Sequence, residues 1–461
     1  MRKFLIAAAS SGSGKTTFTM GLLRRLRNTG LKVQPYKCGP DYIDTKWHTL
    51  SSGRESVNLD LWMSSAEHVK EVFGRYSSDA DVCVVEGVMG LFDGWEKSAG
   101  SCAEVAKLCD LPVVLLVNAK STAYSVAPLI YGFKNFDPDV KIAGVVFNQV
   151  ASESHYAHLK AACEDAGVKC LGYMRRCKDI ELPSRHLGLS IDEKLRIDSF
   201  IDKVAENICL EEGVWDLHYS EFSESSENSE SSEISESSDP SETPQLNNSI
   251  TQKLKTRLIS VASDEAFNFT YRTNIDALKQ MGEVRFFSPM SDEKIPDGTD
   301  LLYLPGGYPE FYLKQLSKNK TMLKSVRDYI ENGGRAYAEC GGMLYLCRNI
   351  IGMDGESYGM ASVLSLEGTF ENMHLHLGYR RLEVGDTLND CMATESQAFG
   401  HEFHYSEVRQ IGEGEKAVGK IYNARGHEVD TRLYRHKNLL AGYTHFYWGD
   451  SNIFSLPFKD F

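Results

Sequence analysis

The chain has no Cys-x-x-Cys pair, no long apolar run and no excess of basic residues. Its 11 cysteines are scattered and odd in number, which argues against a disulfide framework and fits a reducing compartment. No apolar stretch approaches the roughly 20 residues that a membrane-spanning helix needs, and the short N-terminal run does not resemble a signal peptide. The net charge of −14 argues against a nucleic-acid-binding surface. We therefore expect a cytoplasmic protein that binds neither membranes nor nucleic acids.

Basic residues are also missing from a low-complexity segment near the middle of the chain. Between 220 and 244 there are eight acids among serines and no Lys or Arg, and removing these eight from the net charge of −14 leaves −6. Such a segment buries too little apolar surface to offset its chain entropy, so we predict a disordered linker, with a phosphorylated interaction tail as the alternative. The predicted division is a domain at 1–211, a linker at 212–249 and a domain at 250–461.

Two α/β domains are predicted on either side of the linker. A chain of 461 residues is too long for one ordinary core. Short apolar runs alternate with helical patterns, which is typical of a doubly wound, mostly parallel sheet with ligand groups at the carboxyl ends of its strands. The predicted strands are 3–8, 31–36, 82–86, 113–117 and 142–147, then 258–262, 283–287, 301–304 and 335–338.

A phosphate-binding loop is predicted at 7–17, where an apolar strand leads through small residues and Lys-Thr-Thr into a helical pattern. Backbone amides at a helix start point at an anion, and glycines let the backbone approach it closely. Lys15 would bridge the terminal phosphates, and the Thr16 hydroxyl would coordinate Mg²⁺. The usual motif has a glycine where this chain has Ala9. The residues expected to bind ATP are Gly12, Ser13, Gly14, Lys15, Thr16 and Thr17.

Two acidic clusters follow the second and third predicted strands. In Gly-Pro-Asp-Tyr-Ile-Asp, the Gly-Pro turn places Asp41 and Asp44 beyond a strand end. In Glu-Gly-Val-Met-Gly-Leu-Phe-Asp-Gly, Glu86 ends a strand beside the phosphate loop, where a magnesium ligand is expected, and Asp93 is presented to the same space. The alternative is two surface turns with solvated acids, but their shared place at strand ends favours a functional role.

ATP, magnesium and several acids suit the activation of a substrate carboxylate as an acyl phosphate. The acids would hold the metal and orient the acceptor. We therefore predict Asp41, Asp44 and Asp93 as catalytic residues, and Thr16 and Glu86 as Mg²⁺ ligands.

A nucleophilic cysteine is predicted in the second half. The strand at 335–338 leads through Glu-Cys-Gly-Gly-Met into a helical pattern, which is typical of a nucleophile elbow. Such a turn would expose the thiol of Cys340, lower its pKa and let the following amides stabilise an oxyanion. The Gly-Gly turn after strand 301–304 would supply the remaining amides. The oxyanion hole is therefore predicted at Gly306, Gly307 and Gly341.

His445 is the histidine predicted to act as base for this thiol. On spacing alone, other histidines compete with it: His374, His376, His401 and His404. The His-x-x-His spacing of the last two resembles a metal site, but no set of cysteines or acids completes zinc coordination. The other cysteines are expected to be small buried side chains.

Together, these motifs resemble those of the cobyrinic acid a,c-diamide synthase family. The resemblance rests on Ser-Gly-Ser-Gly-Lys-Thr-Thr, Gly-Pro-Asp-Tyr-Ile-Asp, Glu-Gly-Val-Met-Gly-Leu-Phe-Asp-Gly, Leu-Pro-Gly-Gly-Tyr-Pro-Glu and Glu-Cys-Gly-Gly-Met. Further stretches agree at 182–189, 286–289 and 400–404. It covers essentially the whole chain except the acidic segment.

The resemblance implies a dethiobiotin-synthetase-like ATPase domain followed by a class I glutamine amidotransferase domain. Cys340 would release ammonia from glutamine, the ATPase site would phosphorylate the c and then the a acetate carboxylate of cobyrinate, and ammonia would displace each phosphate. The implied enzyme is a carbon–nitrogen ligase of cobalamin biosynthesis that uses ATP, L-glutamine and Mg²⁺. Its oligomeric state, including a homodimer, stays open. Many class I glutaminases have an acid two residues after the histidine, where this chain has Tyr447.

Alternatives remain for the substrate and for the class of protein. Near-identical machinery would amidate the corresponding acetates of nickel-sirohydrochlorin. A P-loop switch ATPase with a glutaminase-like binding domain is the more remote alternative, and the glycine turns around Cys340 argue against it. On charge grounds, Lys37, Arg185 and His186 are candidates for binding the other carboxylates of the tetrapyrrole.

Overall fold

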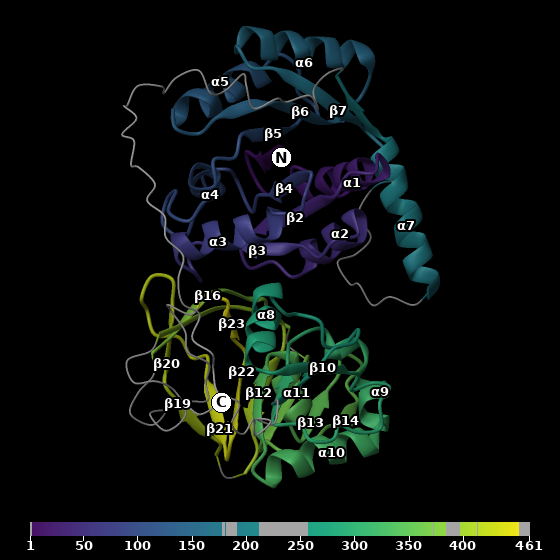
Figure 1. Cartoon of the computed structure of the whole chain (residues 1–461), viewed down its shortest axis with the longest axis vertical. Helices are drawn as coiled ribbons and strands as arrows, with labels where there is room; N and C mark the ends of the chain where they lie inside the picture. Colours follow the sequence, from purple (N-terminus) through teal and green to yellow (C-terminus); the bar gives the residue numbers. More distant parts are fainter. Residues whose placement is uncertain are drawn as a thin grey trace, which may run out of the picture.

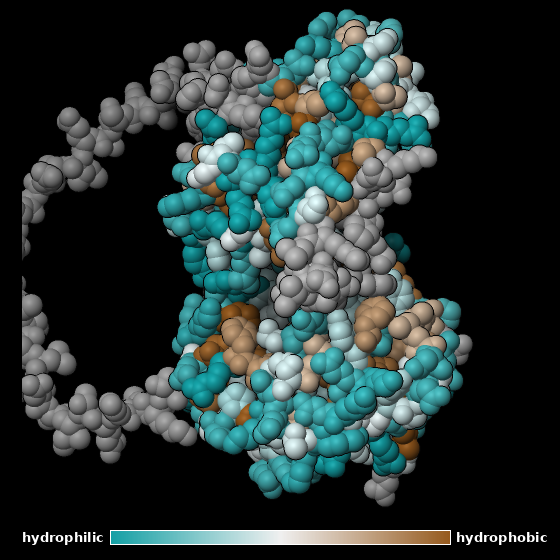
Figure 2. Space-filling model, turned by 90° about the vertical axis from the view of Figure 1, so that its right-hand side faces the viewer, coloured by the Kyte–Doolittle hydropathy of each residue, from teal (hydrophilic) through white to brown (hydrophobic). Residues whose placement is uncertain are grey.

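Two α/β domains make up the described part of the chain. The computed structural model describes residues 2–177, 180, 191–211, 257–371, 373–383, 397–412 and 414–450, the side chains of 191–196 excepted. The predicted linker, 212–249, and the candidate residues Arg185 and His186 lie outside the described residues. Figure 1 shows the N-terminal domain above the C-terminal domain, and Figure 2 shows them as two adjoining lobes whose visible surface is largely hydrophilic. The prediction of two α/β domains is confirmed.

The N-terminal domain is built on an eight-stranded sheet that is parallel except for the last pair. In sheet order its strands are β3 (Val57–Leu59), β2 (Val33–Cys38), β4 (Val82–Glu86), β1 (Arg2–Ala8), β5 (Val113–Asn118), β6 (Ile142–Val150), β7 (Cys170–Arg175) and β8 (Ile208–Leu210). Helices cover both faces of this sheet. Side chains on both faces of the strands are therefore buried, which explains the continuous apolar runs in the sequence. The helices are α1 (Lys15–Asn28), α2 (Ile43–Ser52), α3 (Ala66–Ser77), α4 (Cys102–Leu108), α5 (Val126–Phe136), α6 (Glu153–Asp165) and α7 (Ile191–Glu206).

The register of the central strands brings the predicted motifs to one edge. Ile6 and Lys37 both pair with Glu86 across parallel ladders. The segments that follow β1, β2 and β4 therefore leave the sheet side by side. β2 begins at Val33 and runs to Cys38 rather than spanning 31–36, which keeps Lys37 in the strand.

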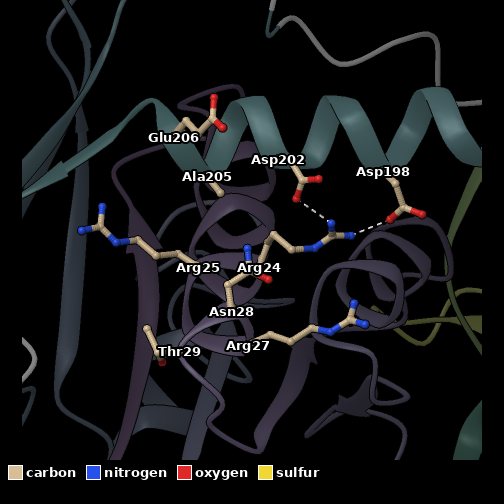
Figure 3. Close-up of a pocket in the computed structure, with 9 residues that line it drawn as sticks. All are labelled: Arg24, Arg25, Arg27, Asn28, Thr29, Asp198, Asp202, Ala205 and Glu206. Atoms are coloured by element: carbon tan, nitrogen blue, oxygen red, sulfur yellow. Dashed lines mark hydrogen bonds and ion pairs between the residues drawn. The ribbon is translucent and has the colours of Figure 1, made fainter.

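Arg24 joins α1 to α7 through a nearly buried guanidinium. Its Nη1 and Nη2 each lie 2.6 Å from a carboxylate oxygen of Asp202 and Asp198, respectively (Figure 3). Its nitrogens also donate to the carbonyls of Ser51 and Leu50 at the end of α2, both at 3.3 Å. One side chain thus connects three helices.

Replacing Arg24 should destabilise the N-terminal domain. The aspartates are half-exposed and can rehydrate, but the two carbonyls lose their donors, so we expect the Arg24→Met variant to lose about 2 kcal/mol, or about 4–8 °C in melting temperature. The measurement is the first thermal transition by calorimetry. The control is Arg27→Met, an exposed arginine of the same helix, which should melt within about 1 °C of the unmodified protein. Equal melting of both variants would contradict the role given to Arg24.

The C-terminal domain is built on a seven-stranded sheet. In order, its strands are β10 (Glu283–Phe287), β9 (Leu258–Ala262), β11 (Leu301–Leu304), β12 (Arg335–Glu339), β22 (Leu439–Gly442), β21 (Leu433–His436) and β19 (Lys416–Val418). The first five strands are parallel to one another, and β21 runs antiparallel to both of its neighbours, β22 and β19. Its helices are α8 (Arg272–Met281), the 3-10 turn η3 (Pro309–Phe311), α9 (Leu313–Lys318), α10 (Lys320–Glu331) and α11 (Gly341–Leu346). The four predicted strands of this domain are confirmed.

Two further four-stranded sheets belong to the C-terminal domain and were not predicted. The first contains β14 (Ser357–Gly359), β13 (Asn349–Ile351), β15 (Leu366–Thr369) and β18 (Glu407–Gln410). The second contains β20 (Lys420–Asn423), β16 (His376–Glu383), β17 (Gln397–His404) and β23 (His445–Phe446). The second sheet pairs His401 with His445, so it carries the histidines toward the domain interface. Among the described residues, no helix has the length and apolar character to cross a membrane.

Candidate active site

The phosphate loop lies between β1 and α1. Gly12 and Gly14 have φ of 75° and 91°, a conformation that favours glycine. A Cβ at Gly14 would lie 2.1 Å from Nδ2 of Asn148, and that amide donates to the Ser13 carbonyl at 2.9 Å. Sequence reasoning missed Asn148. A polar residue near the carboxyl end of an apolar strand is the signal that points to it.

Lys15 begins α1 with its side chain almost fully buried. Its Nζ donates to the carbonyls of Ser10 and Met89 at 3.2 and 2.5 Å. Burial lowers the pKa of Lys15, and the nearby charge of Lys37 lowers it further. The hydrogen-bond acceptors are neutral, so an incoming phosphate would supply the negative charge that they lack.

A cluster of oxygens forms at the carboxyl edge of the sheet. Thr16 Oγ1 lies 2.8 Å from Glu86 Oε1 and 3.1 Å from Asp44 Oδ2. Lys37 Nζ sits between the two carboxylates, 2.6 Å from Asp44 and 2.8 Å from Glu86. His48 Nε2 lies 2.6 Å from the other oxygen of Glu86. The structure brings these predicted residues together and adds His48, which the sequence analysis missed.

The two carboxylates of this cluster differ in how strongly their ionised form is favoured. Burial favours the neutral form of Glu86, but Lys37 and His48 hold the pKa of Glu86 well below its usual value. Burial raises the pKa of Asp44 to about 6, and Lys37 only partly opposes this. Burial also disfavours the Lys37 ammonium, yet Asp44 and Glu86 raise the pKa of Lys37 above its ordinary value. Glu86 is therefore the more firmly ionised of the two carboxylates.

These oxygens fit Mg²⁺ in their chemistry. A hydroxyl and two carboxylates are hard donors, and Mg²⁺ is usually held by one or two carboxylates together with phosphate oxygens and water. The described residues contain no group of three or more His, Cys, Asp or Glu side chains able to hold a metal ion, so phosphate and water would complete the coordination. The ammonium of Lys37 between Asp44 and Glu86 shows that this pair attracts a cation.

Asp41 and Asp93 lie outside this cluster. Asp41 Oδ1 accepts from the amides of Ile43 and Asp44, both at 2.8 Å, and so fixes the start of α2. Asp93 is exposed, and its Oδ2 accepts from the Gly90 amide at 2.8 Å, which closes the turn after β4. Asp41 lines the cleft described next, whereas Asp93 is not among its lining residues.

A cleft of about 750 Å³ opens over the phosphate loop at the domain interface. The N-terminal domain lines it with Ser11, Gly12, Gly14, Lys15, Thr16, Thr17, Lys37, Pro40, Asp41, Tyr42, Ile43, Asp44, Glu86, Gly87, Val88 and Met89. The C-terminal domain lines it with Phe269, Leu377, Gly378, Tyr379, His401 and Phe403. Of the residues predicted to bind ATP, only Ser13 is absent from the lining, and its Oγ donates to the Ser10 carbonyl at 2.9 Å.

Cys340 occupies a strained turn between β12 and α11. Its φ of 47° and ψ of −107° give the strand–turn–helix geometry predicted for a nucleophile elbow. The predicted exposure of the thiol and the predicted lowering of its pKa are both wrong, because Cys340 is buried. Burial raises the pKa of the Cys340 thiol, and the neighbouring carboxylate of Glu310 raises it further. The thiol therefore needs a base at hand to become a nucleophile.

His445 adjoins this thiol across Gly306. A Cβ at Gly306 would lie 2.2 Å from Cε1 of His445 and 3.2 Å from Cβ of Cys340. The His445 ring is buried, and neither of its nitrogens has a hydrogen-bond partner in the described part of the chain. Its position fits the predicted role of base.

The competing histidines are placed differently. His404 uses both ring nitrogens, one on the Ser406 carbonyl at 2.8 Å and one on Glu402 at 2.9 Å. His376 stacks on His404 at 4.7 Å between ring centroids, and His374 is exposed. His401 lines the cleft on the phosphate-loop side, and burial lowers its pKa to about 3.

Two of the three predicted oxyanion-hole glycines border a small cavity beside Cys340. Gly307 and Gly341 line it, and the amide nitrogen of Gly307 lies 3.2 Å from where a Cβ of Gly341 would be. Gly306 is not among its lining residues and lies against the His445 ring instead. The geometry favours the amides at 307 and 341.

Aromatic side chains join the two sites across the domain interface. Tyr42 stacks on Phe269 with 5.1 Å between ring centroids and 7° between planes, and its ring lies 5.1 Å from that of His445. Phe269 and Phe403 line both the cleft and the cavity beside Cys340. Polar contacts across the same interface are His68–Tyr447 (2.9 Å), Asp60–Tyr379 (2.7 Å), Ser65–Asp450 (2.6 Å) and Lys46–Asn268 (2.5 Å). Sequence reasoning did not foresee these contacts.

Known proteins match both halves of the chain. The family model for a CobQ/CobB/MinD/ParA nucleotide binding domain matches residues 4–189, and that for a CobB/CobQ-like glutamine amidotransferase domain matches residues 258–453. The chain is 37% identical over 455 residues to the cobyrinate a,c-diamide synthase of Caldanaerobacter subterraneus subsp. tengcongensis, which covers 96% of this chain and 94% of that protein.

Other relatives agree over similar lengths. The cobyrinate a,c-diamide synthase of Priestia megaterium is 37% identical, with 98% of this chain and 95% of that protein covered. The hydrogenobyrinate a,c-diamide synthase of Brucella ovis is 36% identical, with 93% and 99% covered. In both of its domains and over nearly its whole length, the chain belongs to the cobyrinate a,c-diamide synthase family.

Proposed function

We propose that this protein amidates the a and c acetate carboxylates of a cobyrinate-type tetrapyrrole, with ATP and glutamine as co-substrates. One observation carries the proposal: Phe269 and Phe403 line both the cleft over the phosphate loop and the cavity beside Cys340. Ammonia would then form at Cys340 on one side of these two aromatic side chains, and the acyl phosphate would form near Lys15 on the other side. The names of the relatives, cobyrinate and hydrogenobyrinate synthases, supply the class of substrate.

Ammonia release begins with the buried thiol. The Cys340 proton passes to Nε2 of His445, and the sulfur attacks the side-chain amide carbon of glutamine. The amides of Gly307 and Gly341 receive the oxyanion that forms. His445 returns the proton to the leaving nitrogen, so ammonia departs and a glutamyl thioester remains. Water then hydrolyses the thioester to glutamate and restores the thiol.

Carboxylate activation takes place in the cleft. Lys15 and the loop amides hold the triphosphate, and Asp41 and Asp44 orient the substrate. Thr16 and Glu86 would hold Mg²⁺, which neutralises charge on the phosphates when bound. An acetate oxygen attacks the γ-phosphorus and ADP leaves. Ammonia then attacks the acyl carbon and phosphate leaves, which completes one amide.

The predicted domain limits become part of this proposal. An ATPase domain at 1–211 and a glutaminase domain at 250–461, joined by 212–249, are supported by family matches at 4–189 and 258–453. Ammonia escapes or is protonated in open water, so the proposal requires the domains to stay docked during turnover.

Product mass is the direct test of the function. The protein should be incubated with ATP, nitrogen-15-amide glutamine and one of three tetrapyrroles: cobyrinate, hydrogenobyrinate or nickel-sirohydrochlorin. We expect two labelled amides on cobyrinate or hydrogenobyrinate, and none when ATP is omitted. Amidation of nickel-sirohydrochlorin alone would move the substrate assignment to that alternative. If no tetrapyrrole gains an amide, the proposed function is wrong.

A further inference from the structure

His445 needs a neighbour that holds its ring in one orientation. In triads of a nucleophile, a histidine and an acid, a carboxylate on Nδ1 does this and leaves Nε2 facing the nucleophile. At position 447, where the resemblance places an acid in many glutaminases, this chain has Tyr447. Its hydroxyl lies 2.9 Å from Nε2 of His68 in the N-terminal domain. Tyr447 therefore contributes a hydrogen bond to the domain interface.

Glu339 presents a carboxylate to His445 from another direction. It is the last residue of β12, directly before Cys340, and its side chain is 2% exposed with Oε2 3.7 Å from Nδ1 of His445. The Tyr303 hydroxyl donates to Oε2 at 2.7 Å, and the Phe446 amide donates to Oε1 at 3.0 Å. Two donors, one from β11 and one from β23, thus fix this carboxylate beside a ring nitrogen that has no hydrogen bond.

A second buried carboxylate of this region is already engaged. Glu402 pairs with Arg380 and accepts hydrogen bonds from His404 and Thr431. Its charge is balanced within β16 and β17. In the described part of the chain, Glu339 is the acid whose carboxylate lies beside His445, with Oε2 3.7 Å from Nδ1.

We propose that Glu339 is the positioning residue of the glutaminase site, an inference that rests on the function proposed above. Its carboxylate accepts a hydrogen bond from Nδ1 of His445, and Nε2 then accepts the Cys340 proton. Once that proton has moved from sulfur to Nε2, Glu339 faces an imidazolium and stabilises it. Catalytic hydrogen bonds of unliganded sites are often long and shorten when substrate binds, which accommodates the 3.7 Å separation. The acid of this site is then the residue immediately before the nucleophile.

Glu339→Gln keeps the shape and removes the charge. We expect kcat for glutamine hydrolysis to fall about 100-fold or more, with KM for glutamine changed less than about 3-fold. Amidation supported by added ammonium should stay within about 2-fold of the unmodified protein, because it bypasses the glutaminase step. Loss of both activities together would mean that Glu339 acts only by maintaining the fold, and would overturn the proposal.

The pH profile separates positioning from packing. Without the carboxylate the imidazolium is less stable, so the acid limb of glutamine hydrolysis should move to lower pH in Glu339→Gln. Tyr303→Phe is the matched control, since it removes one hydrogen bond to Glu339 but leaves the charge, and its acid limb should not move. The groups that face His445 are Glu339 from β12, His401 from β17, Tyr42 from the N-terminal domain and Cys340 from the elbow. Apart from Glu339 itself, these neighbours are the same in both variants.

A second substitution keeps the test decisive if Glu339→Gln does not fold. Glu339→Asp retains the negative charge but places it farther from the His445 ring. We therefore expect a reduced kcat for glutamine hydrolysis, with the acid limb of its pH profile unchanged. Full activity in Glu339→Asp or Glu339→Gln would overturn the proposal. Failure of the unmodified protein to hydrolyse glutamine would instead count against the proposed function.

Discussion

Cys340→Ser should abolish the use of glutamine and spare the use of ammonium. Removing the nucleophile of a covalent mechanism typically costs about 1,000-fold or more in kcat. The serine hydroxyl is a much weaker nucleophile than a thiolate, and burial at this turn disfavours its ionisation as it does that of the thiol. The cleft that activates the carboxylate lies on the other side of Phe269 and is left intact.

The measurement compares amide formation by the same enzyme with two nitrogen donors. With glutamine, Cys340→Ser should form no amide above background. With ammonium at alkaline pH, it should reach at least about half of the unmodified rate. Cys347→Ser is the matched control, because Cys347 is buried like Cys340 and its Sγ donates to the Met343 carbonyl, as a serine hydroxyl also can. If the amidation rate of Cys340→Ser falls equally with glutamine and with ammonium, the two sites are not separate.

Glu86→Gln should have the opposite pattern, with loss of amidation from either donor and retention of glutamine hydrolysis. The substitution keeps a polar side chain beside Thr16 and His48 but removes the charge that would hold Mg²⁺ and that now pairs with Lys37. We expect kcat for ATP-dependent amidation to fall about 100- to 10,000-fold. Lys37 keeps Asp44 as a partner, so the loss of stability should stay within about 3 kcal/mol.

The control lies at the other end of the same strand. Asp81 precedes β4 and accepts a hydrogen bond from the Lys32 amide at 2.8 Å, so Asp81→Asn tests the strand without touching the cleft. Its amidation rate should remain within about 2-fold of the unmodified protein. A Glu86→Gln protein that loses glutamine hydrolysis as severely as amidation would indicate general unfolding, and the role of Glu86 would need revision.

The sequence predicts the parallel strands and their terminal loops well, because their signals are local. The apolar run at 82–86 ends on an acid, and the structure places that acid at the sheet edge beside Thr16. The run at 335–338 ends at a turn of small residues, and Cys340 has the strained dihedral angles that such a turn needs. Buried parallel strands carry the same pattern on both faces, so their identification does not depend on knowing what covers them.

The remaining elements depend on partners that are distant in the chain. β16 is half-exposed and has no apolar alternation, so its sequence does not distinguish it from a loop. His48 contacts Glu86 only because α2 packs beside β4, and Glu339 contacts His445 only because β12 lies near β23. Tyr42 stacks on Phe269 across the domain interface. The hydrophobic periodicity of the sequence does not predict how the two domains pack against each other. Such pairings arise from tertiary packing.

The docking interface also bears on how the chain can be divided. Each described contact between the domains joins a residue before 212 to one after 256, as in Tyr42–Phe269 and His68–Tyr447. If the chain were cut between residues 212 and 256, both residues of every such contact would still be present, one on each fragment. The covalent connection then matters through effective concentration, which is about millimolar for short flexible connections and falls as they lengthen. Two separately encoded chains would assemble the same composite site, with a turnover that rises with their concentration.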